Sequence, residues 1–214
     1  MKRATCLMML VLCGCGGKIR YPHYYALEIR PPAPRLADGA RFPGVVSVRR
    51  FEAPAYLRRG GIVYRRTPEE IGFYDYHRWA EIPSDAVTTA VIDALRSARL
   101  FSAVTPYDGQ NRQDYVMSGR LERLDEIDYD GSVRVDVRIS AELTSLREST
   151  TLWTGEGDAS LGIEGHDVTG VVTAMNRALQ RSLDRMLANL EARALNCTRE
   201  TIGQRTGSQG GESR

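Results

Sequence analysis

The clearest pattern in the chain is an alternation of apolar and polar residues over residues 133–143. The apolar positions are Val133, Val135, Val137, Ile139, Ala141 and Leu143. A period of two places these side chains on one face of a strand, so that face is buried while the other contacts water. The pattern predicts a long strand in an antiparallel sheet. A turn at Asp130-Gly131 would join it to a strand over residues 115–127.

Two segments carry apolar residues at the spacing of a helix. The first begins at Ser84, which can cap the helix after Pro83, and ends near Arg99. The second begins at Asp167 and is the longest helical pattern in the chain. Its apolar stripe is formed by Val168, Val171, Val172, Met175, Leu179, Leu183, Met186, Leu187 and Leu190. Because an amphipathic helix buries its apolar stripe, we expect both helices to pack against the sheet.

Shorter apolar and aromatic segments predict the remaining strands, over residues 24–29, 45–51, 62–65, 71–79 and 150–155. Gly60-Gly61 predicts a hairpin that joins residues 56–59 to the strand that follows. The residues around Phe101 are interpreted as an edge or loop segment. Together the elements predict one α+β domain over residues 24–195, with a mostly antiparallel sheet packed against two amphipathic helices.

The N-terminus has the pattern of a lipoprotein leader. Lys2 and Arg3 precede an apolar run over residues 4–12, well short of the roughly 20 residues that span a bilayer. The sequence Leu12-Cys13-Gly14-Cys15 resembles the bacterial lipobox, with a small residue directly before the modified cysteine. We expect residues 1–14 to be a cleaved signal peptide, Cys15 to carry the lipid and residues 15–23 to be a tether. The alternative is an ordinary secretory signal in which both cysteines are incidental.

Lipid on Cys15 predicts a protein that is firmly anchored in the cell envelope. One acyl chain holds a protein only marginally, whereas two or more chains, such as palmitate, hold it stably. Gly16 and Gly17 follow the cysteine, and no aspartate stands next to it. By resemblance to other lipoproteins, this favours the outer membrane, with the domain facing the periplasm.

Composition and charge argue against several classes of protein. The 29 basic residues are spread among 27 acidic ones without a dominant basic segment, so nucleic-acid binding is not expected. Three of the 4 cysteines lie in the first 15 residues, which argues against a disulfide framework. Residues 196–214 are rich in Ser, Thr, Gly and Gln and lack aromatic residues, which predicts a disordered tail.

The chain carries no motif that supplies a catalytic or metal site. His23, His77 and His166 lie far apart in the sequence and lack metal-ligand spacing. The residues from Glu126 resemble half of a calcium loop, but Val137 occupies the position where a bidentate Glu is needed. Phosphate-binding glycine loops and serine-nucleophile elbows are absent from the sequence. We therefore expect a non-enzymatic protein without catalytic residues, a metal or another cofactor.

The order of several short motifs resembles one known family. The motifs are Tyr24-Tyr25-Ala26-Leu27, Tyr56-Leu57-Arg58, Ile62-Val63-Tyr64-Arg65, His77-Arg78-Trp79-Ala80-Glu81 and Leu100-Phe101 with Val104. Together with the long alternating strand and the final helix, they resemble the ABC-type transport auxiliary lipoproteins, a family of PqiC-like envelope lipoproteins. The resemblance extends from about residue 24 to residue 195. Ile82-Pro83 departs from the family pattern, in which Pro and then Leu are expected.

This resemblance implies a function in transport through the cell envelope. Members of the family are expected to assist an ABC permease, an ATPase and an Mce-type substrate-binding protein, which move lipids between membranes. The auxiliary lipoprotein itself is expected to hydrolyse nothing. The alternative is a stand-alone structural lipoprotein that binds cell-wall or outer-membrane components without any transporter.

Aromatic and arginine residues concentrate in residues 56–79, which we interpret as the contact with a partner protein. Tyr, Trp and Arg are the residue types enriched where proteins bind each other. The candidate partner-binding residues are Tyr56, Arg58, Arg59, Tyr64 and Arg65. The expected partner is the Mce-type protein or a second copy of the chain in a homo-oligomer. The alternative is that the large aromatics, such as Phe73 and Trp79, are core and the arginines form a solvated face.

Overall fold

The computed structural model describes residues 20–31, 42–110, 113–129, 131–165 and 167–208, with side chains up to residue 195 in the last helix. The expected signal peptide, Cys15 and most of the expected tether lie outside these residues. Along the chain the elements are β1 (His23–Tyr25), β2 (Phe42–Val48), η1 (Leu57–Arg59), β3 (Gly61–Arg65), β4 (Gly72–Trp79), α1 (Pro83–Ala98), β5 (Phe101–Pro106), β6 (Tyr115–Tyr129), β7 (Ser132–Ser145), β8 (Thr150–Gly162) and α2 (Val168–Ser208). Neither helix in this part of the chain is apolar enough over a sufficient length to cross a bilayer.

The strands form one mixed eight-stranded sheet, built around the long antiparallel ribbon of β6, β7 and β8. The other side of β6 pairs in parallel with two short strands. β2 lies beside its start, with Val46 opposite Tyr115, and β3 lies beside its end, with Val63 opposite Asp125. β5 extends the sheet beyond β2, whereas β4 and then β1 extend it beyond β3. The length of β6 therefore connects the two ends of the sheet.

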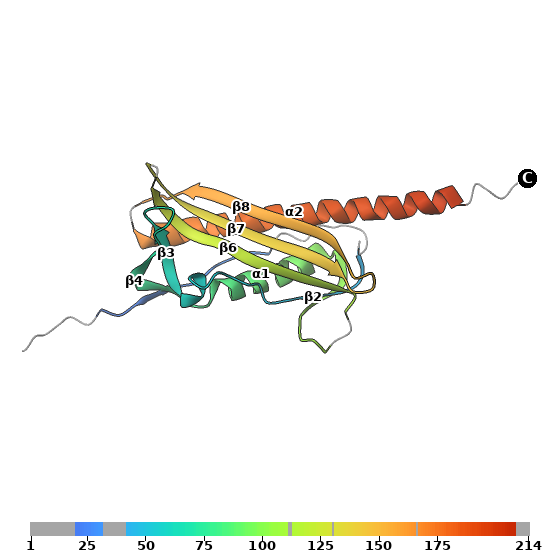
Figure 1. Cartoon of the computed structure of the whole chain (residues 1–214), viewed down its shortest axis with the longest axis horizontal. Helices are drawn as coiled ribbons and strands as arrows, with labels where there is room; N and C mark the ends of the chain where they lie inside the picture. The colour runs from blue at the N-terminus through green and yellow to red at the C-terminus, as the bar shows by residue number, and fades with distance from the viewer. Residues whose placement is uncertain (1–19, 32–41, 111–112, 130, 166, 209–214) are drawn as a thin grey trace, which may run out of the picture.

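Both helices lie behind the sheet in Figure 1 and enclose the core against it. The predicted alternation is confirmed in β7, where the apolar side chains from Val135 to Leu143 are buried, while Val133 at the strand's start is 47% exposed. The predicted stripe of α2 is confirmed as well, since Met175, Leu179 and Leu190 are fully buried. The molecule is thus a single α+β domain with two helices packed on one sheet.

Four of the seven strand pairings among the described residues are parallel, which the sequence pattern did not indicate. The antiparallel ribbon nevertheless carries most of the paired residues. Parallel neighbours require a long crossover between them, and α1 lies in the crossover that brings β5 beside β2. β5 occupies the segment around Phe101 and is an edge strand, paired with β2 only.

The predicted hairpin at Gly60-Gly61 is wrong. η1 makes a single 3-10 turn of Leu57–Arg59, and Gly60, with a φ of 75°, ends it. This left-handed backbone conformation suits glycine, which has no Cβ to clash. β3 instead pairs with β4 in an antiparallel hairpin, with Tyr64 opposite Gly72. Residues 56–59 therefore form a turn and not a strand.

The last helix is longer than its apolar stripe predicts. α2 continues through residues 196–208, where the composition predicts a disordered tail. Once a helix exists, each added residue gains a backbone hydrogen bond without a new nucleation cost, so polar residues can prolong it. A composition rule treats the segment in isolation and does not include the helix that precedes it. Residues 209–214 lie outside the described residues.

Gly157 of β8 lies where α2 crosses the sheet, and we expect Gly157→Ala to destabilise the fold. An added Cβ would lie 1.9 Å from the carbonyl oxygen of Ser182, a backbone atom that moves only if α2 moves. Overpacking of this kind lowers the free energy of unfolding by about 3 kcal/mol. Gly162→Ala in the same strand is the matched control, because nothing lies within 4 Å of its added Cβ. Denaturant unfolding compares the two variants, and equal midpoints would contradict the close approach of α2 to β8.

Candidate functional site

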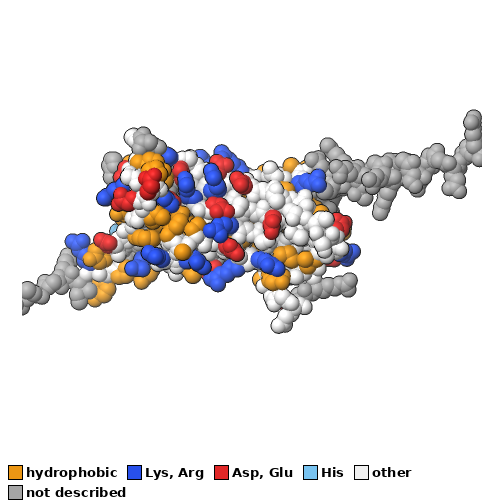
Figure 2. Space-filling view, in the orientation of Figure 1, with side chains coloured by type: hydrophobic (Ala, Val, Ile, Leu, Met, Phe, Trp, Pro, Cys, Tyr) orange, Lys and Arg blue, Asp and Glu red, His pale blue; other side chains and the backbone are white. Residues whose placement is uncertain are grey.

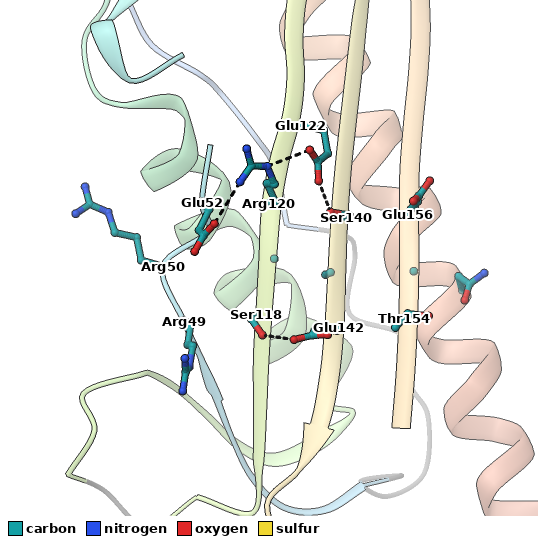
Figure 3. Close-up of a pocket in the computed structure, with 14 residues that line it drawn as sticks. Arg49, Arg50, Glu52, Ser118, Arg120, Glu122, Ser140, Glu142, Thr154 and Glu156 are labelled. Carbon is teal, nitrogen blue, oxygen red and sulfur yellow. Dashed lines mark hydrogen bonds and ion pairs between the residues drawn. The ribbon is translucent and has the colours of Figure 1, made fainter. Parts of the chain in front are cut away.

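A groove of about 850 Å³ crosses the face of β6, β7 and β8 that is turned away from the helices (Figure 3). The walls consist of polar side chains at outward positions of the three strands. These are Ser118, Arg120 and Glu122 on β6, Ser140 and Glu142 on β7, and Thr154 and Glu156 on β8. Arg49, Arg50 and Glu52, just after β2, line the side next to β6, and Asn189 of α2, which binds Trp153 of β8, also lines the groove. The groove is therefore open to solvent, and most of its lining side chains are polar or charged.

Small residues form the floor of this groove. Gly119, Ala141 and Gly155 lie opposite one another in a single row across the three strands. Packing explains why position 119 is a glycine, because an added Cβ would lie 2.3 Å from the ring of buried Phe51. The ring can approach the β6 backbone only where the side chain is missing. The Cβ positions of this row point into the core, so it is the backbone of these residues that faces the groove.

Arg120 is the centre of the hydrogen-bonded network in the groove (Figure 3). Its Nη1 lies 3.2 Å from Oε2 of Glu52, and its Nε lies 3.1 Å from Oε2 of Glu122. The hydroxyl of Ser140 donates a hydrogen bond of 2.9 Å to the second oxygen of Glu122. A chain of contacts therefore extends from Glu52 across β6 to β7. It holds these side chains in defined positions although they are exposed to solvent.

The other half of the groove contains carboxylates without a basic partner. Glu142 accepts a hydrogen bond of 3.0 Å from the hydroxyl of Ser118. Among the side chains that the structure describes, neither Glu142 nor Glu156 has an ion pair. Arg49 lies instead over the ring of Tyr107, 4.5 Å from its centre, and Arg50 pairs with Asp85. This half can accept hydrogen bonds or a positive charge from a binding partner.

A second hollow of about 570 Å³ continues the groove beyond β6. The two share Arg50, Glu52 and Arg120 in their linings, so they lie next to each other. Arg58, one of the residues that the sequence singled out, lines this second hollow together with Ile82. The structure therefore places Arg58 beside the groove, whereas none of the other predicted residues lines either hollow.

Tyr56 and Arg65 come together around one buried acid. The Asp125 side chain of β6 is fully buried, and its Oδ2 lies 2.6 Å from the Nε of Arg65, whose own side chain is only 13% exposed. The Tyr56 hydroxyl donates a longer bond of 3.4 Å to the same oxygen, and the Arg65 guanidinium lies 5.4 Å from the centre of the Tyr56 ring. Two of the predicted binding residues thus stabilise a buried charge inside the domain.

The charges in this cluster favour its present protonation state. Burial, followed by the Asp125 carboxylate, raises the pKa of the Tyr56 hydroxyl, so it remains a hydrogen-bond donor. Burial lowers the pKa of the Arg65 guanidinium, but its hydrogen bonds to Asp125 and Tyr56 outweigh that effect and raise the pKa. Arg65 therefore stays charged.

Tyr64 lies in an aromatic cluster at the hairpin of β3 and β4. Its ring packs edge-on against Tyr74 at 5.2 Å, and the Arg66 guanidinium lies 5.2 Å from the Tyr64 ring centre. Tyr74 donates a hydrogen bond of 2.7 Å to buried Glu126. Burial raises the pKa of the Glu126 carboxyl, and burial together with this bond raises the pKa of Tyr74. The half-buried Tyr64 serves mainly to cover this cluster.

Arg58 and Arg59 remain as the predicted residues with free side chains. Both are exposed in η1, and neither has an ion pair among the described residues. The Arg59 guanidinium lies 5.9 Å from the centre of the Phe73 ring. Of the five predicted binding residues, these two are therefore the ones that the structure leaves exposed.

Sequence reasoning missed the groove residues on β6 and β8. The polar positions between apolar ones in β6 indicate an outward face, but the alternation cannot show which polar residues meet across strands. Only the register places Arg120 opposite Ser140 and Ser140 opposite Glu156. The groove offers carboxylates, hydroxyls and guanidinium groups, which suit recognition of a polar surface. Within the described part of the chain, no three His, Cys, Asp or Glu side chains gather to hold a metal ion.

Solved structures share this fold at low sequence identity. A protein from Xanthomonas campestris is 19% identical with a TM-score of 0.66, over 87% of this chain and 99% of that one. An uncharacterized protein is 14% identical with a TM-score of 0.56, over 85% of this chain and 99% of that one. A hypothetical protein from Chlamydia trachomatis is 11% identical with a TM-score of 0.51, over 72% of this chain and 98% of that one. These likenesses establish the fold alone.

No curated protein matches the chain. A family model does match it, over residues 25–187, and its description is ABC-type transport auxiliary lipoprotein component. The match extends from the end of β1 to the buried part of α2 and includes the whole sheet between them. It covers well over half of the chain and confirms the resemblance carried by the sequence motifs. The chain belongs to the family of ABC-type transport auxiliary lipoproteins.

Proposed function

We propose that this protein is a non-enzymatic auxiliary component of an ABC/Mce-type system that transports lipids between membranes. Its partners are an Mce-type substrate-binding protein, the ABC permease and the ATPase. Lipid on Cys15 holds it in the outer membrane, with the domain in the periplasm. Membership in the family over residues 25–187 is the observation that supports the role of an envelope lipoprotein associated with ABC transport.

The surface supports a function in protein binding. The groove and the adjacent second hollow, which we call the depression, carry polar side chains, several of which are held in place by Arg120. Protein interfaces outside obligate assemblies are polar at the rim, with about one hydrogen bond per 100–200 Å². Arg58 at the edge of this depression and exposed Arg59 beside it add positive charge. We place the contact with the Mce-type partner on this side of the domain.

Charge reversal at Arg58 and Arg59 tests this placement. The double variant Arg58→Glu, Arg59→Glu should bind the partner about tenfold more weakly or worse, because like charges across an interface cost several kcal/mol. Its thermal stability should remain nearly that of the wild type, since neither side chain has an ion pair among the described residues. The measurement is co-purification of the lipoprotein with the Mce-type protein after mild detergent extraction.

Arg99→Glu with Arg181→Glu is the matched control, because both of these arginines are exposed and lie outside the groove. The control should co-purify like the wild type. Equal co-purification of both double variants would place the contact elsewhere. A wild-type chain that brings down cell-wall or outer-membrane components, and none of the transport proteins, would favour a stand-alone structural lipoprotein instead.

A further inference from the structure

The most exposed aromatic side chains lie together where the described chain begins. Tyr21 and Tyr24 are 75% and 64% exposed, the highest values among the large hydrophobic side chains that the structure describes. Tyr76 of β4 is 42% exposed, and the guanidinium of Arg20 lies 5.7 Å from the centre of its ring. We call Arg20, Tyr21, Tyr24 and Tyr76 the tyrosine patch. Figure 2 shows orange and blue side chains side by side at this end of the molecule.

The fold itself turns these side chains outward. The register of β3 and β4 shifts between two pairs, Gly61 with Arg78 and Val63 with Phe73. One residue of β3 lies there opposite four residues of β4, so β4 bulges. Bulges re-aim side chains at the edges of sheets, and Tyr76 lies in this one. β1 pairs with β4 alone and forms the edge of the sheet, with Tyr24 opposite Arg78. The tyrosine patch is therefore part of the ordered domain.

The composition of the patch fits a lipid headgroup region. Tyrosine is enriched at membrane interfaces, because its ring is apolar and its hydroxyl remains in water. Arg20 and exposed Arg78 can pair with lipid phosphates, while Asp75 is the exposed acid in the same bulge. Two further exposed apolar side chains lie toward this end of the sheet. Ile71 precedes Gly72, which lies opposite Tyr64, and Val133 lies opposite Asp128.

The short length of chain between Cys15 and the patch favours the membrane as the surface that the patch contacts. Arg20 is five residues after Cys15, and five residues span at most about 18 Å even when fully extended. The headgroup layer on each side of a bilayer is itself roughly 5–8 Å thick. If Cys15 carries the lipid, the patch must therefore remain within a short distance of the membrane surface. A protein partner would have to fit into the same narrow space.

We propose that the tyrosine patch contacts the membrane surface and sets the orientation of the domain on it. This proposal rests on the lipid anchor at Cys15. Figure 1 shows β1 near one end of the long axis, whereas α2 extends past the sheet at the other end. With the patch on the lipid headgroups, the far end of α2 points away from the bilayer into the periplasm. The groove then lies along the side of the domain, where a second protein can reach it.

Hydrogen exchange on the full lipidated protein tests the proposal. The wild-type chain and Tyr21→Ser, Tyr24→Ser, Tyr76→Ser are reconstituted on vesicles of phosphatidylethanolamine and phosphatidylglycerol. The amides of residues 20–25 and 73–78 in the wild type should exchange more slowly on vesicles than in the unlipidated Cys15→Ala chain without vesicles. The triple variant should stay attached to the vesicles but lose this protection. Unchanged exchange in β6 and β7 confirms that the triple variant is folded.

Tyr107→Ser with Leu146→Ser is the matched control, because these exposed side chains lie near the start of β6, at the other end of the sheet. The control should keep the protection. Equal protection in the wild type and the triple variant, or none in either, would overturn the membrane contact and leave the anchor intact. Protection that appears without vesicles and grows with protein concentration would assign the patch to a second copy. A wild-type chain that does not sediment with vesicles would refute the anchor, and this proposal with it.

Discussion

Replacing Cys15 with alanine is expected to move the protein almost completely from the membrane fraction to the soluble fraction. Each buried CH₂ of an acyl chain contributes about 0.8 kcal/mol, so two or more chains dominate the partition over any contact of the domain surface. The variant needs a cleavable secretory leader of the ordinary type, because an uncut native leader would itself hold the chain at the membrane. Fractionation of cells followed by immunoblotting measures the outcome.

Cys13→Ala is the control for this experiment, since Leu12 directly before Cys13 makes that cysteine a poor lipobox residue. The control should remain in the membrane fraction, and mass spectrometry should show an acylated peptide that begins at Cys15. A peptide that begins at Cys13, or that carries no acyl mass, contradicts the prediction. Both variants should stay folded, because the first buried core residue along the described chain is Leu27.

Arg65→Met should lower the free energy of unfolding by about 3–5 kcal/mol, because it leaves the buried Asp125 carboxylate without its partner. Asp125 is fully buried, so water cannot replace the guanidinium. The Tyr56 hydroxyl is too far, at 3.4 Å, to compensate for the lost charge. Methionine keeps most of the length and apolar character of the side chain, so the loss reflects the charge and not a cavity. Denaturant unfolding at neutral pH measures it.

Two further variants separate the ion pair from other causes. Arg66→Met removes the exposed neighbouring arginine, which lies over the Tyr64 ring, and should change stability by less than about 1 kcal/mol. Arg65→Met combined with Asp125→Leu removes both charges and should recover most of the lost stability, as replaced buried ion pairs often do. If Arg65→Met is as stable as the wild type, Arg65 is available for a partner after all.

The predicted partner segment thus divides into residues with different tasks. Arg65 neutralises the buried Asp125 and Tyr56 donates a hydrogen bond to it, whereas Arg58 and Arg59 of η1 are exposed. In the sequence these arginines are equivalent, since all of them lie in one segment that is rich in aromatic residues. The difference arises from β6, which is remote in the chain and brings Asp125 opposite Val63 of β3. A binding role for Tyr56 and Arg65 remains a prediction, and its test must take their structural contact into account.

Local patterns in the sequence predicted most of the elements and much of the core. The alternation in β7 and the stripe of α2 each identify a buried face, because the geometry of a strand or helix links neighbouring positions directly. The leader and its lipobox are likewise read from contiguous residues. Such information does not depend on any distant part of the chain.

The arrangement of the short strands and the shape of the site were decided by the tertiary structure. The parallel pairing of β2 and β3 with opposite ends of β6 depends on long crossovers, whose course no local pattern encodes. The groove is assembled by the register, which brings outward polar side chains of β6, β7 and β8 side by side, such as Arg120, Ser140 and Glu156. The sequence by itself determined which residues could form most of the strands and helices, while the anchor at Cys15 remains a prediction. Strand register and the packing of the helices on one face of the sheet determined which of these residues meet. Both the register and the packing bring together residues that are far apart in the chain, which a local pattern does not describe.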